Sequence, residues 1–81
     1  MDADKYIQIL GQVIREKREK LGYSQESFAA EVGLHRTYIG QVERGEKNIT
    51  IKNMLKISLA LGEEPHKILS KIKPSIKQTT T

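Results

Sequence analysis

The sequence predicts an all-α fold, a compact bundle of five short helices. Apolar residues recur at helical spacing along much of the chain, which favours helices with one buried side. No segment shows the clean two-residue alternation of a half-buried strand. The connections between the periodic segments are two to six residues long, and connections this short favour neighbouring helices that pack closely.

The first two predicted helices are bounded by cap residues. The first runs over about 4–21 and stops at Gly22, since glycine adopts a positive φ without steric cost. Ser24 is a good N-cap for the second helix, over 25–32, and Gly33 ends it. The apolar positions of the first helix are Ile7, Leu10, Ile14 and Leu21.

The next two helices follow the same rules. The third is expected over about 36–44, and Gly45 closes it. Thr50 is an N-cap for a fourth helix over 51–61, which Gly62 stops. Each boundary therefore combines a capping residue with a change in the apolar pattern.

The chain of 81 residues provides one domain and is too short for a second core. Pro65 suits the first turn of a fifth helix, over about 65–73. We expect the helical domain over residues 1–73 and a mobile tail over 74–81.

The second and third helices together form a helix-turn-helix pattern. Gly33 makes the turn, Leu34 fills the corner, and Ala29 is small where the two helices cross. Ile39 and Val42 return to the same core as Phe28 and Val32. An ordinary helical hairpin is the alternative that this pattern alone leaves open.

The outward face of the third helix favours the first interpretation. Arg36 can pair with a guanine edge, Gln41 with adenine, and Thr37 can touch a thymine methyl or a phosphate. Gly40 lies in the same face and costs about 1 kcal/mol of helix stability against alanine. Close approach of a base or of the DNA backbone would explain it. The whole face comprises Arg36, Thr37, Gly40, Gln41 and Arg44.

The charge distribution agrees with a polyanionic partner. Residues 1–34 carry five Lys or Arg against six Asp or Glu, whereas residues 35–81 carry nine against four. The basic surplus therefore begins where the third helix begins. A surplus of this kind is typical of nucleic-acid binding, although a solvated lysine-rich tail would account for about half of it.

A buried ion pair is expected between the first and third helices. Arg18 continues the apolar side of the first helix, and an unpaired guanidinium in the core would be very costly. Glu43 lies one turn after Ile39, on the inner side of the third helix. We predict that Arg18 and Glu43 pair; the alternative is that Arg18 extends to solvent.

The composition argues against several other functions. Cysteine is absent, which excludes disulfides and thiolate metal sites and fits a reducing cytoplasm. His35 and His66 are about thirty residues apart, and the acidic residues show no metal-ligand spacing. No apolar run approaches the ~20 residues of a membrane span. We therefore expect a cytoplasmic protein without metal, cofactor, membrane contact or catalytic activity.

The run SQESFAAEVGLHRTYIGQVERGEKNITIKNMLKISLALG resembles the Cro and phage-repressor class of helix-turn-helix regulators, the xenobiotic-response-element group. The resemblance covers residues from about 8 to 73. The segment HRTYIGQVERGEKNITI is also similar to controller proteins of restriction–modification systems. The class implies a lambda-repressor-like DNA-binding domain whose third helix enters the major groove.

The resemblance also implies roles for individual residues. By that motif Arg36, Thr37 and Gln41 would meet bases. His35 stands where the class usually has a small polar or acidic residue, so we expect a phosphate contact in place of a helix cap. The residues that would meet the sugar–phosphate backbone are Gln25, His35, Tyr38, Arg44, Lys47 and Asn48.

A homodimer that forms through the fifth helix is implied as well. Its two reading helices would lie about 34 Å apart, so the DNA target would be an interrupted palindrome. RNA polymerase is a further candidate partner. An antitoxin or another protein-interaction module that shares this domain is the alternative function. The residues expected at the dimer interface are Leu61, Ile68, Leu69 and Ile72, with Ile76.

Overall fold

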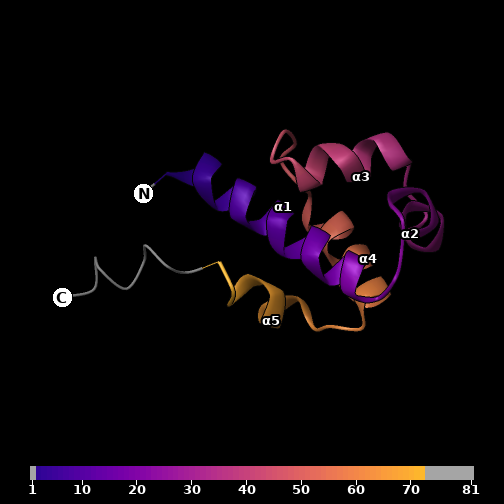
Figure 1. Cartoon of the computed structure of the whole chain (residues 1–81). Helices are drawn as coiled ribbons and strands as arrows, with labels where there is room; N and C mark the ends of the chain where they lie inside the picture. The colour runs from indigo at the N-terminus through magenta and orange to yellow at the C-terminus, as the bar shows by residue number, and fades with distance from the viewer. Residues whose placement is uncertain (1, 73–81) are drawn as a thin grey trace.

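The computed structural model describes residues 2–72, and within them the chain folds as five helices without a strand (Figure 1). The tail expected after Pro74 and the interface residue Ile76 lie outside the described residues. The main contacts between helices are in the pairs α1–α3, α1–α5, α2–α3, α2–α4 and α4–α5. Their bounds are α1 (Ala3–Lys20), α2 (Gln25–Val32), α3 (Arg36–Glu43), α4 (Ile51–Leu61) and α5 (Pro65–Leu69).

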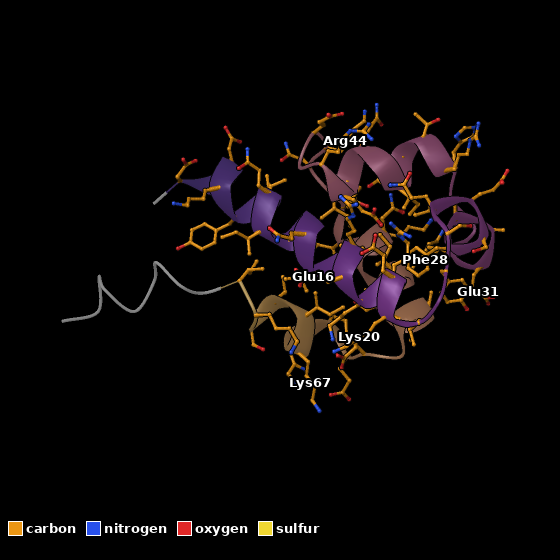
Figure 2. All side chains as sticks on the ribbon, viewed as in Figure 1. Glu16, Lys20, Phe28, Glu31, Arg44 and Lys67 are labelled. Atoms are coloured by element: carbon orange, nitrogen blue, oxygen red, sulfur yellow. The ribbon has the colours of Figure 1, made fainter. Side chains whose placement is uncertain are left out.

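Side-chain caps fix the ends of α2 and α4 where the sequence predicts them. Ser24 Oγ accepts a hydrogen bond from the Ser27 backbone N–H at 3.0 Å, and Thr50 Oγ1 accepts one from Asn53 at 3.1 Å. Gly33 and Gly62 end these helices with φ of 83° and 71°, the left-handed region that glycine enters freely. Within α2, Phe28 is buried while Glu31 is exposed to solvent (Figure 2).

Four helix ends differ from the sequence prediction, one of them the end of α1, which stops at Lys20 with Leu21 as its C-cap. α1 begins one residue earlier, because Asp2 Oδ1 accepts from the N–H groups of Asp4 and Lys5. α3 ends at Glu43, with Arg44 as its C-cap. α5 ends at Leu69, whereas the sequence extends it to about 73. The Ser70 hydroxyl donates to the Lys67 carbonyl at 2.8 Å, and such local bonds compete with helix continuation.

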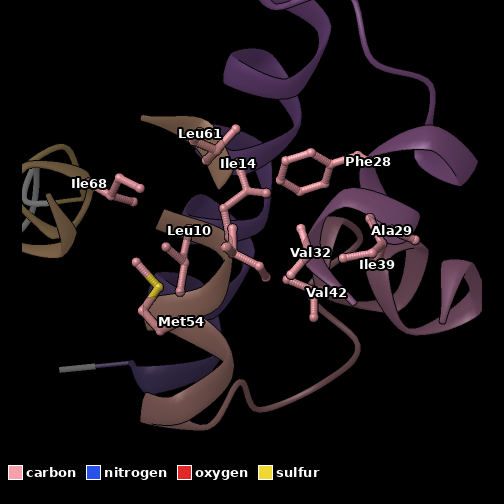
Figure 3. Close-up of a cluster of buried hydrophobic side chains, with 11 residues drawn as sticks. Leu10, Ile14, Phe28, Ala29, Val32, Ile39, Val42, Met54, Leu61 and Ile68 are labelled. Carbon is pink, nitrogen blue, oxygen red and sulfur yellow. The ribbon is translucent and has the colours of Figure 1, made fainter. Parts of the chain in front are cut away.

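All five helices contribute to one aliphatic core (Figure 3). The apolar positions expected from α2 and α3 are buried in it. Of the apolar positions expected on the first helix, Leu10 and Ile14 are buried and Ile7 is half-buried, whereas Leu21, the C-cap of α1, is 54% exposed. The Tyr23 ring packs on Phe28 with centroids 5.5 Å apart. The core residues are Leu10, Ile14, Phe28, Ala29, Val32, Ile39, Val42, Met54, Ile57, Leu61 and Ile68.

The structure places the residues expected at the dimer interface in different environments. Ile68 is fully buried and Leu61 is buried as well, so neither offers surface to a partner. The reason is that α5 packs against both α1 and α4 and turns Ile68 inward between them. Leu69, one position further round the helix, is 46% exposed, and Ile72 packs partly against the core.

Gly11 is a close-contact position that the sequence interpretation missed. A Cβ on Gly11 would lie 2.2 Å from the Val42 carbonyl oxygen and 2.7 Å from that of Glu43. The backbone of α1 therefore lies directly against the last turn of α3. Because the contact atoms belong to the backbone, they cannot move aside as a flexible side chain can. Gly11 thereby helps to set the position of α3 on α1.

Replacing Gly11 by alanine is expected to destabilise the protein by about 1–3 kcal/mol, the usual cost of overpacking. Alanine would otherwise add up to about 1 kcal/mol of helix propensity at this position, so a net loss measures the clash. Urea unfolding of Gly11→Ala, with Gln12→Ala on the exposed side of α1 as control, tests this. A variant as stable as the wild type would show that the two helices can separate without cost.

Candidate nucleic-acid interface

The outward side of α3 is polar and accessible, while its inward side belongs to the core. Arg36 and Thr37 are exposed and Gln41 is half-buried, so all three have atoms at the surface. Arg44, the C-cap, is exposed at the end of the same helix (Figure 2). We call these four residues the reading face: Arg36, Thr37, Gln41 and Arg44.

His35 is the N-cap of α3, which the sequence interpretation did not expect. Its Nδ1 accepts a hydrogen bond from the Thr37 backbone N–H at 3.1 Å. In the neutral imidazole the proton then lies on Nε2, and the side chain is exposed. Capping therefore leaves an N–H donor on the ring. The contact of His35 with phosphate stays a prediction.

Gly40 has a different environment from the one expected. It is buried, and a Cβ there would lie 3.0 Å from Arg44 Nη1 and 3.4 Å from Gln25 Oε1. Side chains of the protein itself therefore lie beside the space that the glycine leaves. Both are flexible ends of long side chains, and Gly40 leaves room for the Arg44 guanidinium beside α3.

A buried polar network lies beneath the reading face. Arg18 donates from Nε to Glu43 Oε2 at 2.7 Å and from Nη2 to Glu43 Oε1 at 3.1 Å, the pairing that the sequence predicts. Its Nη1 donates to the Tyr23 carbonyl at 2.7 Å. The hydrogen bond to Glu43 raises the pKa of Arg18. The network joins α1, α3 and the turn before α2.

Gln25 completes this network. Its Nε2 donates to Glu43 Oε1 at 3.0 Å, a role that the sequence does not reveal because the two residues are 18 positions apart. Among residues 2–72, every buried side-chain nitrogen and oxygen has a hydrogen-bond partner. The phosphate contact expected of Gln25 stays a prediction, and its side-chain amide already has a structural role.

The other residues expected at the DNA backbone lie in the first turn of α3 and in the loop that follows the helix. Tyr38 is half-buried, and its hydroxyl oxygen accepts from Asn53 Nδ2 at 3.0 Å, which ties α3 to α4. Lys47 and Asn48 are exposed in the loop that follows Gly45. Their positions are compatible with backbone contacts, since the same loop leaves the end of the reading face.

Two carboxylates face the arginines of the reading face, and the sequence interpretation missed both. Arg44 donates from Nε to Glu46 Oε2 at 2.9 Å and from Nη2 to Glu46 Oε1 at 3.2 Å. This hydrogen bonding lowers the pKa of Glu46. Arg36 lies 3.9 Å from a carboxylate oxygen of Glu26. A shallow notch lies between them, lined by Gln25, Glu26, Arg36, Thr37, Gly40 and Arg44.

The described part of the chain holds no cluster of three or more His, Cys, Asp or Glu side chains that could bind a metal ion. Within the same residues, no helix combines the length and the apolar character that a membrane crossing requires.

Comparisons with known proteins identify relatives of this chain. A family model described as Helix-turn-helix matches residues 14–68. The control protein C.BamHI of Bacillus amyloliquefaciens is 47% identical over 62 residues, which cover 75% of this chain and 76% of that protein. The crystal structure of the restriction-modification controller protein C.AhdI from Aeromonas hydrophila is similar, with a TM-score of 0.80 and 41% identity over 84% of this chain and 99% of that chain.

A third relative was solved with its ligand. The biofilm regulator SinR in complex with DNA has a TM-score of 0.71 and 31% identity, covering 74% of this chain and 97% of that chain. The family model spans more than half of the present sequence and includes all of α2, α3 and α4. The chain therefore belongs to the helix-turn-helix family of DNA-binding transcription regulators, not to an enzyme family, and is similar to restriction-modification control proteins.

Proposed function

We propose that the protein acts as a homodimer that inserts α3 into the major groove and reads an interrupted palindrome. The observation that carries this proposal is the reading face, which is accessible on the outer side of a helix whose other side is locked into the core. Arg36, Thr37 and Gln41 are proposed to contact base edges, for which their side chains are chemically suited.

The backbone contacts are proposed for residues around that helix. Arg44, Lys47 and Asn48 leave the C-terminal end of α3, and Tyr38 lies on its flank. His35 offers a ring N–H at the other end. Contacts of this kind position a protein on DNA without reading its sequence, and they make binding strongly dependent on salt.

The dimer interface is proposed to lie on α4 and α5. Ile51, Leu55 and Leu59 recur every fourth residue along α4, and all three are exposed. Exposed apolar side chains that share one face often mark an interface, and a domain of this size gains stability from dimerisation. α5 packs against α4, and its Leu69 adds a fourth exposed apolar side chain.

The regulatory context is proposed from the relatives. Two of them are a control protein and a restriction-modification controller protein, and the chain covers three quarters or more of the length of each. We propose that this protein likewise controls restriction–modification genes in the cytoplasm. Sequencing the genes next to its own tests this, since a methyltransferase and a nuclease are expected there.

Arg36→Ala tests the reading face. The variant is expected to lose about 1–3 kcal/mol of binding free energy at the selected site and to accept other bases at one position of each half-site. Selection of duplexes from a random pool gives the site for the wild type and the variant. Lys20→Ala removes the same charge from the end of α1, on the far side of the molecule from Arg44 (Figure 2), and should select the wild-type sequence. An Arg36→Ala variant with unchanged affinity and preference would refute the assignment.

A further inference from the structure

The geometry points to Glu46 as a specificity-determining residue that pairs with Arg44 and weakens binding to non-operator DNA more than binding to the operator. This inference rests on the proposed function and adds a role to a residue outside the reading face. Three observations carry it: the two-bonded contact with Arg44, the fixed backbone of Glu46, and the position of the third guanidinium nitrogen.

Glu46 takes two of the three nitrogens of Arg44. Nε and Nη2 each donate to a different carboxylate oxygen, at 2.9 Å and 3.2 Å. Both side chains are more than half exposed, so the pair contributes little to folding. Its main effect is electrostatic, because it cancels one positive charge at the end of α3 and places a carboxylate where phosphates are expected.

The backbone holds Glu46 in this position. Its N–H donates to the Gln41 carbonyl at 2.8 Å. The preceding Gly45 has φ of 73°, and a Cβ there would lie 2.6 Å from Gln8 Cγ and 2.9 Å from Gln8 Cα. The turn that carries Glu46 is therefore packed against α1. The fold itself therefore holds Glu46 next to Arg44.

The remaining nitrogen of Arg44 lies in the notch between α2 and α3. Nη1 is 3.0 Å from the point that a Cβ on Gly40 would occupy, and it has no partner among the hydrogen bonds of residues 2–72. Glu46 thus fixes the orientation of the guanidinium and leaves one edge for a phosphate. A donor that is already oriented loses less freedom on binding.

The cancelled charge and the fixed orientation of Arg44 have different consequences at the operator and on other DNA. Binding to random sequence is almost entirely a count of neutralised phosphates, so cancelling the charge of Arg44 reduces it directly. At the operator, base contacts add to the affinity and the oriented Nη1 meets a phosphate in a fixed register. Glu46 therefore costs affinity mainly on the wrong DNA. Glu26 is a weaker case, since a single distance of 3.9 Å joins it to Arg36.

Glu46→Gln tests the inference, because it keeps the shape of the side chain and removes its charge. Affinities are measured by titration against a random-sequence duplex and against the duplex that the wild type enriches from a random pool, over a range of salt. On the random duplex we expect affinity to rise about 5–10-fold per protomer near 0.1 M salt and the salt slope to steepen by about 0.9 per protomer. On the enriched duplex we expect a rise several-fold smaller.

Two controls separate the pair from a general charge effect. Glu31→Gln removes an exposed charge from α2 and should change both affinities little. In an Arg44→Gln background there is no guanidinium for Glu46 to orient, so Glu46→Gln should raise both affinities by a similar factor. The inference is overturned if Glu46→Gln behaves as Glu31→Gln does, if with Arg44 present it raises both affinities by the same factor, or if its larger effect on the random duplex persists without Arg44. A wild-type protein that enriches no sequence would instead overturn the proposed function, and the inference with it.

Discussion

Replacing Glu43 by alanine is expected to lower the free energy of unfolding by about 3–5 kcal/mol, the cost of leaving a buried charge without its partner. Arg18 and Glu43 are both buried and joined by two hydrogen bonds of 2.7 and 3.1 Å. Without the carboxylate, the guanidinium keeps only the Tyr23 carbonyl and the distant Glu19. Gln25 loses its partner as well. Urea unfolding followed by circular dichroism measures the loss.

Glu19 provides a matched control within the same protein. Its carboxylate lies 3.8 Å from Arg18 Nη2, but its side chain is 53% exposed. Glu19→Ala therefore removes the same group from the same arginine in solvent, where a pair contributes at most about 1 kcal/mol. If Glu43→Ala and Glu19→Ala had similar stability, burial would not be what makes the Glu43 pair important.

A double variant separates the effect of the ion pair on stability from its effect on DNA binding. Apolar residues of similar volume can often replace a buried ion pair at little cost. The double variant Arg18→Met with Glu43→Leu should therefore recover most of the stability that Glu43→Ala loses. It should still bind DNA less tightly, because the bonds that fix the inner side of α3 to Gln25 and to α1 are gone. Recovery of stability with full DNA affinity would show that α3 is positioned without the network.

Local sequence chemistry was sufficient to predict much of this fold. Ser24, Thr50, Gly33 and Gly62 act at short range through their own backbone and side-chain bonds, so the ends of α2 and α4 follow from residue type and spacing. The Arg18–Glu43 pair was predictable for a different reason. A charge on an apolar side must find a partner, and Glu43 was a suitable acid on the facing side of the third helix.

The features that were missed depend on how helices approach one another. The sequence does not distinguish Gly11 from the other glycines, because only the structure shows that the Val42 carbonyl lies against it. Gln25 reaches Glu43 only because α2 and α3 cross where they do. The Arg44–Glu46 pair depends on the turn at Gly45. The spacing of residues along a helix gives no information on these distances.

The fifth helix shows the same limit most clearly. Ile68, Leu69 and Ile72 share one side of a predicted helix, and the sequence does not say whether that side faces the core or a second copy. In the structure α5 is short and packs on two helices, so Ile68 is used by the core and Leu69 is not. The exposed apolar residues of α4 then become the better candidates for the interface.

A pair of substitutions distinguishes a dimer interface at Ile68 of α5 from one on the outer side of α4. Ile68→Asp is expected to unfold the protein, because it removes packing worth about 2–5 kcal/mol and buries a carboxylate without a partner. Leu59→Asp, at a side chain that is 79% exposed, is expected to leave the helical circular-dichroism spectrum intact. It should yield monomers in sedimentation and weaken operator binding, since a monomer contacts one half-site at a time. A folded, monomeric Ile68→Asp protein would return Ile68 to the interface, and a dimeric Leu59→Asp protein would exclude the outer side of α4.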